Sequence, residues 1–328
     1  MAGLLNGQWV EKLPDPDQSE AGEYNRPSSA YRSAISSDPD AEFVAEPGRY
    51  RLWVAWACPW AGRTLAMRAL KQLEEIVPIS IGHRGEEGWT YDEGPDGEEG
   101  PYPLHRLYTL DDPHYTGKVT VPVLWDSRTQ RIVNNESADI IRILNSAFNG
   151  HTGNYLDLNP DALHEQIDHW NDIIYPGLNN GVYRAGFATA QTAYEAAANG
   201  VFETLDLMES HLAQNRYLAG EYCTEADWRA FVSLVRFDIA YHGAFKCNLR
   251  RIADYPALSN YLRELYQWPG IAQTIRQDVI KPDYYSIPLA NPNGIIPIGP
   301  EVDYAALHNR AELEGRGIWD CAAEDSAA

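Results

Sequence analysis

The feature that most constrains the fold is the junction at Cys58, where an apolar run meets an amphipathic one. Residues 48–57, GRYRLWVAWA, are apolar and aromatic and follow turn residues, a pattern typical of a buried strand. Residues 59–75 carry apolar side chains three and four apart and begin with Pro59, whose missing N–H costs nothing at a first helical position. Residues 76–82 predict a second strand, so the junction opens a β-α-β unit with parallel strands.

The position of Cys58 before a helix has a chemical consequence. The N–H groups and dipole of a helix N-terminus favour an anion, so we expect a lowered thiol pKa and a nucleophilic thiolate. The alternative is an inert cysteine buried in an apolar run. Ala61 stands where a second cysteine would complete a CxxC dithiol, so a mixed disulfide at Cys58 would need an external thiol. The remaining cysteines are expected to be reduced thiols; they are Cys223, Cys247 and Cys321. The sequence contains no CxxC pair, so a structural zinc site is not expected.

The elements that follow complete a recognisable order. Residues 83–118 are rich in glycine, proline and acidic side chains and show no clear period, which indicates a functional excursion. Residues 119–137 predict two strands, and residues 137–148 predict a helix for which Ser137 is a suitable cap. The order β-α-β, excursion, β-β-α is that of a thioredoxin-like domain.

The second half of the chain is predicted to be helical. From Asp161 onward apolar residues recur three and four apart, which indicates a helical bundle, and Thr224 and Asp227 form a structural capping box. An N-terminal arm is expected to wrap over the body through Trp9, Tyr24 and Tyr31. The predicted organisation is an arm, an α/β thioredoxin-like thiol-binding domain, an all-α substrate domain and an irregular tail: residues 1–47, 48–150, 151–280 and 281–328.

The net charge of −21 excludes some partners. A nucleic-acid or anionic membrane surface needs basic side chains, so neither is expected as a partner. We find no apolar run of membrane-spanning length and no signal-peptide pattern, which predicts a cytoplasmic protein. The acidity is also compatible with a high-salt host.

Two further motifs point to peptide binding. Val121 precedes Pro122 where thioredoxin-like folds place a cis proline, so its backbone is predicted to pair with an extended peptide; a trans proline at a strand start is the alternative. Glu136 and Ser137 begin the next helix, where they are suited to an α-ammonium and a carboxylate. Taken alone, the pair is an ordinary helix start; beside the other motifs it suggests a γ-glutamyl head group.

These motifs resemble the glutathione transferase superfamily over roughly residues 48–275. The stretches RYRLWVAWACPWAGRTL, KVTVPVLWD, NNESADIIR, GVYRAGFA and KPDYYS are similar, in that order, to the Xi-class glutathione transferases, or glutathionyl-hydroquinone reductases. The resemblance implies the glutathione transferase fold. It also implies a homodimer, with glutathione as cosubstrate, no metal, and an aromatic hydroquinone thioether as second substrate.

The resemblance also implies roles for individual residues. Cys58 is the expected nucleophile and Tyr183 the expected general acid. Tyr241 and Tyr284 are expected to bind the second substrate and to stabilise the thiolate, although Tyr285 competes with Tyr284 for this role. The glutathione-binding residues implied by the family are Trp89, Lys118, Val119, Thr120, Val121, Glu136 and Ser137.

The expected activity is the thiol-dependent reduction of glutathionyl-hydroquinones through a mixed disulfide at Cys58, with release of glutathione disulfide. The alternatives are an omega-like cysteine-type transferase or deglutathionylase, and a non-catalytic protein that binds aromatic ligands. A tyrosine- or serine-type transferase is disfavoured because Cys58 occupies the activating position. The γ-glutamyl site does not distinguish glutathione from γ-glutamylcysteine.

Overall fold

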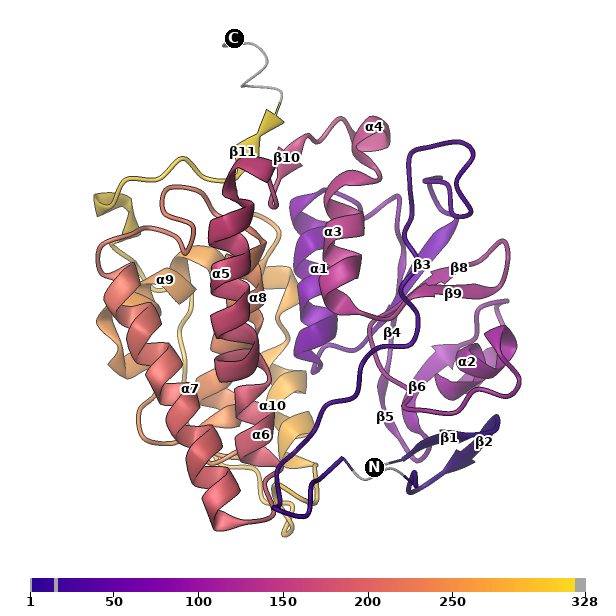
Figure 1. The fold of residues 1–328 in the computed structure, drawn as a ribbon, viewed down its shortest axis with the longest axis horizontal. Helices are drawn as coiled ribbons and strands as arrows, with labels where there is room; N and C mark the ends of the chain where they lie inside the picture. Colours follow the sequence, from indigo (N-terminus) through magenta and orange to yellow (C-terminus); the bar gives the residue numbers. More distant parts are fainter. Residues whose placement is uncertain (1, 15–16, 322–328) are drawn as a thin grey trace. The chain divides into compact units, whose positions relative to one another are not determined.

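The computed structural model describes residues 2–14 and 17–321 and divides the chain into two compact units. The first unit comprises Met1–Asp17 and Pro27–Asn154, and the second comprises Gln18–Arg26 and Tyr155–Ala328. Figure 1 follows the chain through both units in sequence order.

A four-stranded sheet forms the centre of the first unit. Its strands, in spatial order, are β4 (Ile79–Ile81), β3 (Tyr50–Val54), β8 (Val123–Asp126) and β9 (Arg131–Asn134). β3 runs parallel to β4 and antiparallel to β8, so the predicted β-α-β and β-β arrangements are confirmed. Helices α1 (Pro59–Leu70) and α3 (Ser137–Ser146) pack side by side (Figure 1). β8 is buried throughout, as expected of a central strand.

The excursion has more structure than its sequence pattern indicates. It holds β5 (His83–Gly85), β6 (Gly88–Glu93), β7 (Glu99–Pro103) and α2 (His105–Asp111). The three strands form a small antiparallel sheet in the order β5-β6-β7. Its outer strands are largely exposed, so they need no alternation of apolar side chains, and glycines with positive φ at Gly88 and Gly97 interrupt the pattern.

The arm is attached by the three anchors that the sequence predicts. It begins with a hairpin of β1 (Gly3–Leu5) and β2 (Gln8–Val10). Trp9 stacks on His105, and Tyr31 packs against two tyrosines of the first unit. Tyr24 meets Phe187 edge to face, with ring centroids 5.3 Å apart, so residues 18–26 belong to the second unit.

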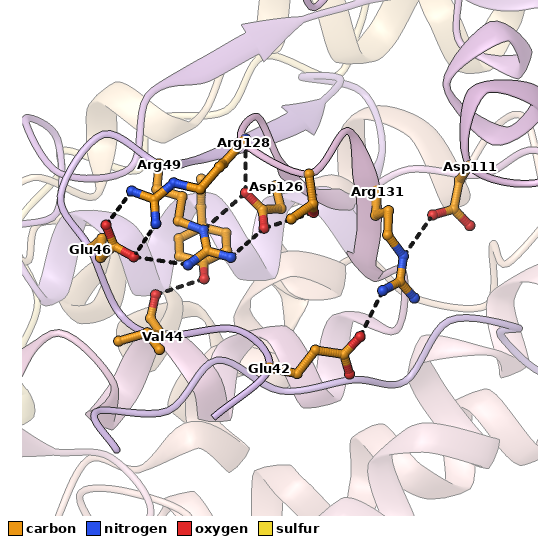
Figure 2. A network of polar contacts seen from close by, with 10 residues as sticks. Glu42, Val44, Glu46, Arg49, Asp111, Asp126, Arg128 and Arg131 are labelled. Atoms are coloured by element: carbon orange, nitrogen blue, oxygen red, sulfur yellow. Dashed lines mark hydrogen bonds and ion pairs between the residues drawn. The ribbon is translucent and has the colours of Figure 1, made fainter. Parts of the chain in front are cut away.

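Ion pairs hold the last part of the arm to the β8–β9 hairpin. Figure 2 shows that Arg49 links Glu46 to Asp126, while Arg131 links Glu42 to Asp111. The Asp126 carboxylate is fully buried and accepts two hydrogen bonds from Arg49, at 3.0 Å and 2.6 Å. The buried charge is thereby paired and hydrogen-bonded.

The second unit is helical, as predicted. Its helices are α5 (His164–Ile174), α6 (Gly181–Gly186), α7 (Gln191–Leu212), α8 (Glu225–Arg236), α9 (Pro256–Tyr266) and α10 (Gln277–Tyr285). π-Helical turns follow α5 and α8, over Tyr175–Asn179 and Phe237–Tyr241. All residues of α8 except Arg229 are buried, and the predicted capping box of Thr224 and Asp227 begins it.

The C-terminal segment is more ordered than expected. α10 continues to Tyr285, and β11 (Trp319–Asp320) pairs with β10 (Leu156–Asp157). In the segment between α10 and β11, the guanidinium of the buried Arg310 donates to three backbone carbonyl oxygens. These belong to the last residue of α7 and to two residues that follow it: Leu212, Asn215 and Arg216. The tail is therefore fastened to the helical unit.

Short helical segments complete the fold. They are α4 (Asn149–Thr152) and 3₁₀ turns at Asp161–Leu163, Ile252–Asp254, Ala272–Thr274 and Arg310–Glu312. Within residues 2–14 and 17–321, no helix has the length and apolar character of a membrane span. Over the same residues, no three His, Cys, Asp or Glu side chains gather as a metal site.

Candidate active site

Cys58 lies where the sequence predicts, between β3 and α1. It is the N-cap residue of α1, with extended backbone angles, and Pro59 occupies the first helical position. Its carbonyl oxygen accepts the N–H of Gly62 at 2.9 Å, which closes the first helical turn. The thiol is half-buried and donates to the carbonyl oxygen of Val121, with a sulfur–oxygen distance of 3.5 Å.

The segment before Pro122 turns its backbone toward the thiol. The Val121–Pro122 peptide bond is cis, as the sequence predicts. The hydroxyl of Tyr108 accepts the N–H of Thr120 at 3.2 Å and donates to its carbonyl oxygen at 3.0 Å, as a neighbouring strand would. Successive residues of an extended chain direct their backbone groups to opposite sides, so Thr120 faces Tyr108 and Val121 faces Cys58. Val121 is thus suited to pair with an extended peptide beside the thiol.

The start of α3 differs in one detail from the prediction. Glu136, not Ser137, is the N-cap: its backbone is extended and its carboxylate accepts the N–H of Ala138 at 3.1 Å. Ser137 is the first helical residue, is buried, and accepts a hydrogen bond from Arg63 at 3.3 Å. The longer Glu136 side chain curls back over the first turn, so the carboxylate replaces the predicted serine cap.

The remaining residues implied for thiol binding lie in the same unit. Trp89 is on β6, half-buried, with the Arg84 guanidinium 5.0 Å from its ring centroid. Lys118 forms an ion pair with Asp17 of the arm, and Val119 is half-exposed beside it. In the described structure, the ammonium of Lys118 therefore meets a carboxylate of this chain.

The other buried cysteines are chemically unlike Cys58. Burial raises the pKa of the Cys223 thiol well above its ordinary value and raises that of Cys247 to about 12. Both thiols stay protonated at neutral pH, and a protonated thiol is a poor nucleophile. Cys321 is exposed. Cys58 is thus the half-buried thiol at a helix N-terminus, as predicted.

Three tyrosines predicted for the second substrate form one cluster in the second unit. They come from α6, from the π-helical turn after α8, and from α10. The hydroxyl of Tyr284 lies 2.6 Å from that of Tyr183 and 3.1 Å from that of Tyr241. Phe245 packs against all three rings, with centroid separations of 5.3 to 5.4 Å. Tyr183 is half-buried, whereas Tyr241 and Tyr284 are buried.

The cluster distinguishes Tyr284 from its neighbour. The Tyr285 hydroxyl lies beside Gly243 and accepts a hydrogen bond from the backbone of Ala244, rather than bonding a hydroxyl of the cluster. Burial, together with the nearby hydroxyls of Tyr183 and Tyr241, raises the pKa of Tyr284 well above its ordinary value. Tyr284 therefore stays protonated and can donate a hydrogen bond at neutral pH.

Several contacts at this site were not predicted from the sequence. Ser29 of the arm donates to Glu136 at 2.9 Å, and Asn135 donates to Tyr108 at 3.1 Å. Arg63, almost fully buried, lies with its guanidinium 4.6 Å from the Trp60 ring centroid. The pattern NNES contains Asn135, but only the fold brings it to Tyr108.

Comparisons with known proteins agree with this architecture. Residues 57–147 match the family model for the glutathione S-transferase N-terminal domain, and residues 191–264 match the model for the C-terminal domain. The glutathionyl-hydroquinone reductase PcpF of Sphingobium chlorophenolicum is 48% identical, over 92% of this chain and 96% of its own length. The matches confirm the predicted fold class.

Solved structures give the same assignment. A Xi-class glutathione transferase from Natrialba magadii superposes with a TM-score of 0.87 at 41% identity, covering 96% of this chain and 98% of its own. The glutathione-bound structure of YqjG from Escherichia coli superposes with a TM-score of 0.81 at 46% identity, covering 86% of this chain and 96% of its own. This chain belongs to the Xi class of glutathione transferases, the glutathionyl-hydroquinone reductase family.

Proposed function

We propose that this protein reduces glutathionyl-hydroquinones to hydroquinones with glutathione as the reductant. The observation that carries the proposal is the half-buried Cys58 thiol at the N-terminus of α1, 3.5 Å from the backbone oxygen of Val121. A peptide thioether paired with Val121 would bring its sulfur to this thiol. The relatedness to PcpF, which is named for this activity, supports the same assignment.

The first chemical step forms a mixed disulfide. The Cys58 thiolate attacks the thioether sulfur, the sulfur–carbon bond breaks, and the aromatic carbon leaves with the electron pair. Tyr183 protonates that carbon as general acid, which gives the free hydroquinone. We propose that Tyr241 and Tyr284 bind the aromatic ring's hydroxyls and hydrogen-bond the thiolate.

The second step regenerates the thiol. A glutathione thiolate attacks the mixed disulfide, glutathione disulfide leaves, and Cys58 returns as a thiolate. An external thiol is needed because Ala61 replaces the second cysteine of a CxxC motif. Overall, one glutathione and one glutathionyl-hydroquinone give one hydroquinone and one glutathione disulfide.

We propose that glutathione is held along the first unit. Val121 pairs with its cysteinyl backbone, and Glu136 and Ser137 receive the γ-glutamyl end. The remaining contacts are assigned to Trp89, Lys118, Val119 and Thr120, by the family resemblance. Since this arrangement reads the γ-glutamyl end, γ-glutamylcysteine is a second candidate thiol. Steady-state rates with each thiol, at equal concentrations, would decide between the two.

The decisive experiment follows both products. Purified protein is given a glutathionyl-hydroquinone and glutathione, and the hydroquinone and glutathione disulfide are quantified by chromatography. Cys58→Ser should abolish turnover, whereas Cys321→Ser, at an exposed cysteine, should leave it unchanged. Turnover by Cys58→Ser would refute the mechanism. Faster conjugation of chlorodinitrobenzene than thioether cleavage would favour an omega-like transferase, and binding without turnover would favour a ligand-binding protein.

We also propose a homodimer and a cytoplasmic location. Both are carried over from the family resemblance and the sequence pattern. Sedimentation equilibrium over a range of protein concentrations tests the dimer, and fractionation of the native host tests the location.

A further inference from the structure

The N-terminal arm contacts the first unit at the residues proposed to bind the γ-glutamyl end. The Ser29 hydroxyl donates to Glu136 Oε2 at 2.9 Å, and the carbonyl oxygen of Asn135, at 3.3 Å, is a second and longer acceptor for it. Two residues later the arm pairs with the residue before Glu136: Tyr31 N–H donates to Asn135 Oδ1 at 3.1 Å, and Asn135 N–H donates to Tyr31 O at 3.1 Å. One short segment thus touches the carboxylate and fixes the backbone that carries it.

The Glu136 carboxylate is held at both oxygens. Oε1 accepts the N–H of Ala138 at 3.1 Å, and Oε2 accepts the Ser29 hydroxyl. Oε1 also accepts the Ser137 hydroxyl at 3.5 Å. A carboxylate offers about four acceptor positions, so these three bonds leave room for an incoming ammonium. Without Ser29, the side chain would lose one anchor, and binding a ligand would have to restrict its rotamers.

The same contacts continue to the other end of the proposed thiol site. Asn135 Nδ2 donates to the Tyr108 hydroxyl at 3.1 Å, and that hydroxyl bonds both backbone groups of Thr120. Burial raises the pKa of Tyr108 despite these hydrogen bonds, so its hydroxyl stays neutral. Asn135, the chain neighbour of Glu136, is therefore joined by hydrogen bonds through Tyr108 to Thr120, the residue before Val121.

We propose that Ser29 is a positioning residue for the thiol site. Its hydroxyl orients Glu136 to receive the α-ammonium of the γ-glutamyl group, and the Tyr31–Asn135–Tyr108 contacts hold that carboxylate at a fixed distance from Val121. The inference rests on the proposed function, since it concerns the same thiol. The arm is then part of the binding site and contributes to the choice of thiol.

The test uses two unreactive ligands and the full chain. S-methylglutathione carries the α-ammonium, and the otherwise identical N-glutaryl analogue lacks it. Titration calorimetry measures both dissociation constants for wild type, Ser29→Ala, Ser29→Thr and Ser33→Ala. Ser33 is the matched control, because its hydroxyl makes no hydrogen bond to any residue that the structure describes.

Ser29→Ala should raise the dissociation constant for S-methylglutathione between about twofold and tenfold, the effect of one lost hydrogen bond. The same substitution should leave the dissociation constant for the glutaryl analogue unchanged, because that ligand has no ammonium for Glu136 to bind. Ser29→Thr should restore affinity, and Ser33→Ala should match wild type. Equal loss for both ligands, no loss, or tighter binding by Ser29→Ala would overturn the inference. Failure of wild type to bind S-methylglutathione would instead refute the proposed function and, with it, this inference.

Discussion

The hydroxyls of Tyr183 and Tyr284 lie 2.6 Å apart, although 101 residues separate them in the sequence. Tyr284 also bonds Tyr241, so it is the central member of the cluster. Tyr183 is the member with partial exposure, and it is therefore the member suited to pass a proton to a bound substrate. Tyr284, protonated because its pKa is raised, is suited to orient the Tyr183 hydroxyl.

This arrangement predicts unequal effects of removing each hydroxyl. Tyr183→Phe should lower kcat about a hundredfold or more, the usual size of a general-acid contribution. Tyr284→Phe should lower kcat about tenfold, because it removes a hydrogen bond to the acid rather than the acid itself. Steady-state assays measure kcat, and single-turnover rates of hydroquinone release show whether the loss lies in the first chemical step. Tyr285→Phe serves as the adjacent control and should retain wild-type rates. An equal or larger loss in Tyr284→Phe would contradict these roles.

The contrast between prediction and structure has a physical basis. The strand and helix around Cys58 were predicted because burial imposes a strong pattern there. α10 was missed because it spans only Gln277–Tyr285 and contains Pro282, which is uncommon within a helix. The bond between Ser29 and Glu136 joins residues 107 positions apart, so no local pattern reports it. Family resemblance supplied the tyrosines, and the hydroxyl contacts that set Tyr284 apart from Tyr285 join residues too distant in sequence for a local pattern to report.

The buried pair of Arg49 and Asp126 predicts acid sensitivity of the first unit. Burial alone would raise the pKa of Asp126, but hydrogen bonds from Arg49, Thr129 and the Arg128 N–H outweigh burial and lower it. The ionised Asp126 carboxylate therefore contributes to the free energy of unfolding above the ordinary carboxyl pKa, near 4. This contribution is lost as the pH falls through the lowered pKa.

Asp126→Asn should reduce the free energy of unfolding at pH 7 by about 3 kcal/mol, because it leaves Arg49 without its buried counter-charge. Urea unfolding at pH 7, 5, 4 and 3 should show that the difference from wild type narrows below pH 4. Glu98→Gln, in an exposed pair with Arg106, is the control and should leave the free energy of unfolding close to that of wild type at every pH, because an exposed ion pair is screened by solvent. A difference that persists unchanged at pH 3 would rule out the linkage.

Arg310 predicts that the C-terminal segment stabilises the helical unit. The residue is 2% exposed, and its guanidinium donates three hydrogen bonds of 2.6 Å to carbonyl oxygens at and after the end of α7. Arg310→Met should cost about 3 kcal/mol or more, since buried acceptors lose charged donors.

Limited proteolysis should detect earlier cleavage after residue 285 in Arg310→Met than in wild type, and urea unfolding should give the loss of stability. Arg276→Met, in an exposed pair with Asp278, is the matched control and should behave as wild type in both assays. Equal protease resistance of the two variants would show that the tail is fastened by other contacts.

Two helical glycines, one beside the tyrosine cluster and one with open space around it, offer opposite tests of packing. A Cβ added at Gly186 in α6 would lie 2.3 Å from Cγ of Phe245, the ring that contacts all three tyrosines. Gly186→Ala should therefore destabilise the second unit by about 1–3 kcal/mol, the cost of overpacking, and lower kcat as Phe245 moves.

A Cβ at Gly200 in α7 meets nothing within 4 Å among the described residues. Gly200→Ala should stabilise the protein by about 0.5–1 kcal/mol, through helix propensity alone, and leave kcat unchanged. Thermal unfolding with parallel rate measurements separates the two, and a stabilised, fully active Gly186→Ala would show that Phe245 does not set the geometry of the cluster.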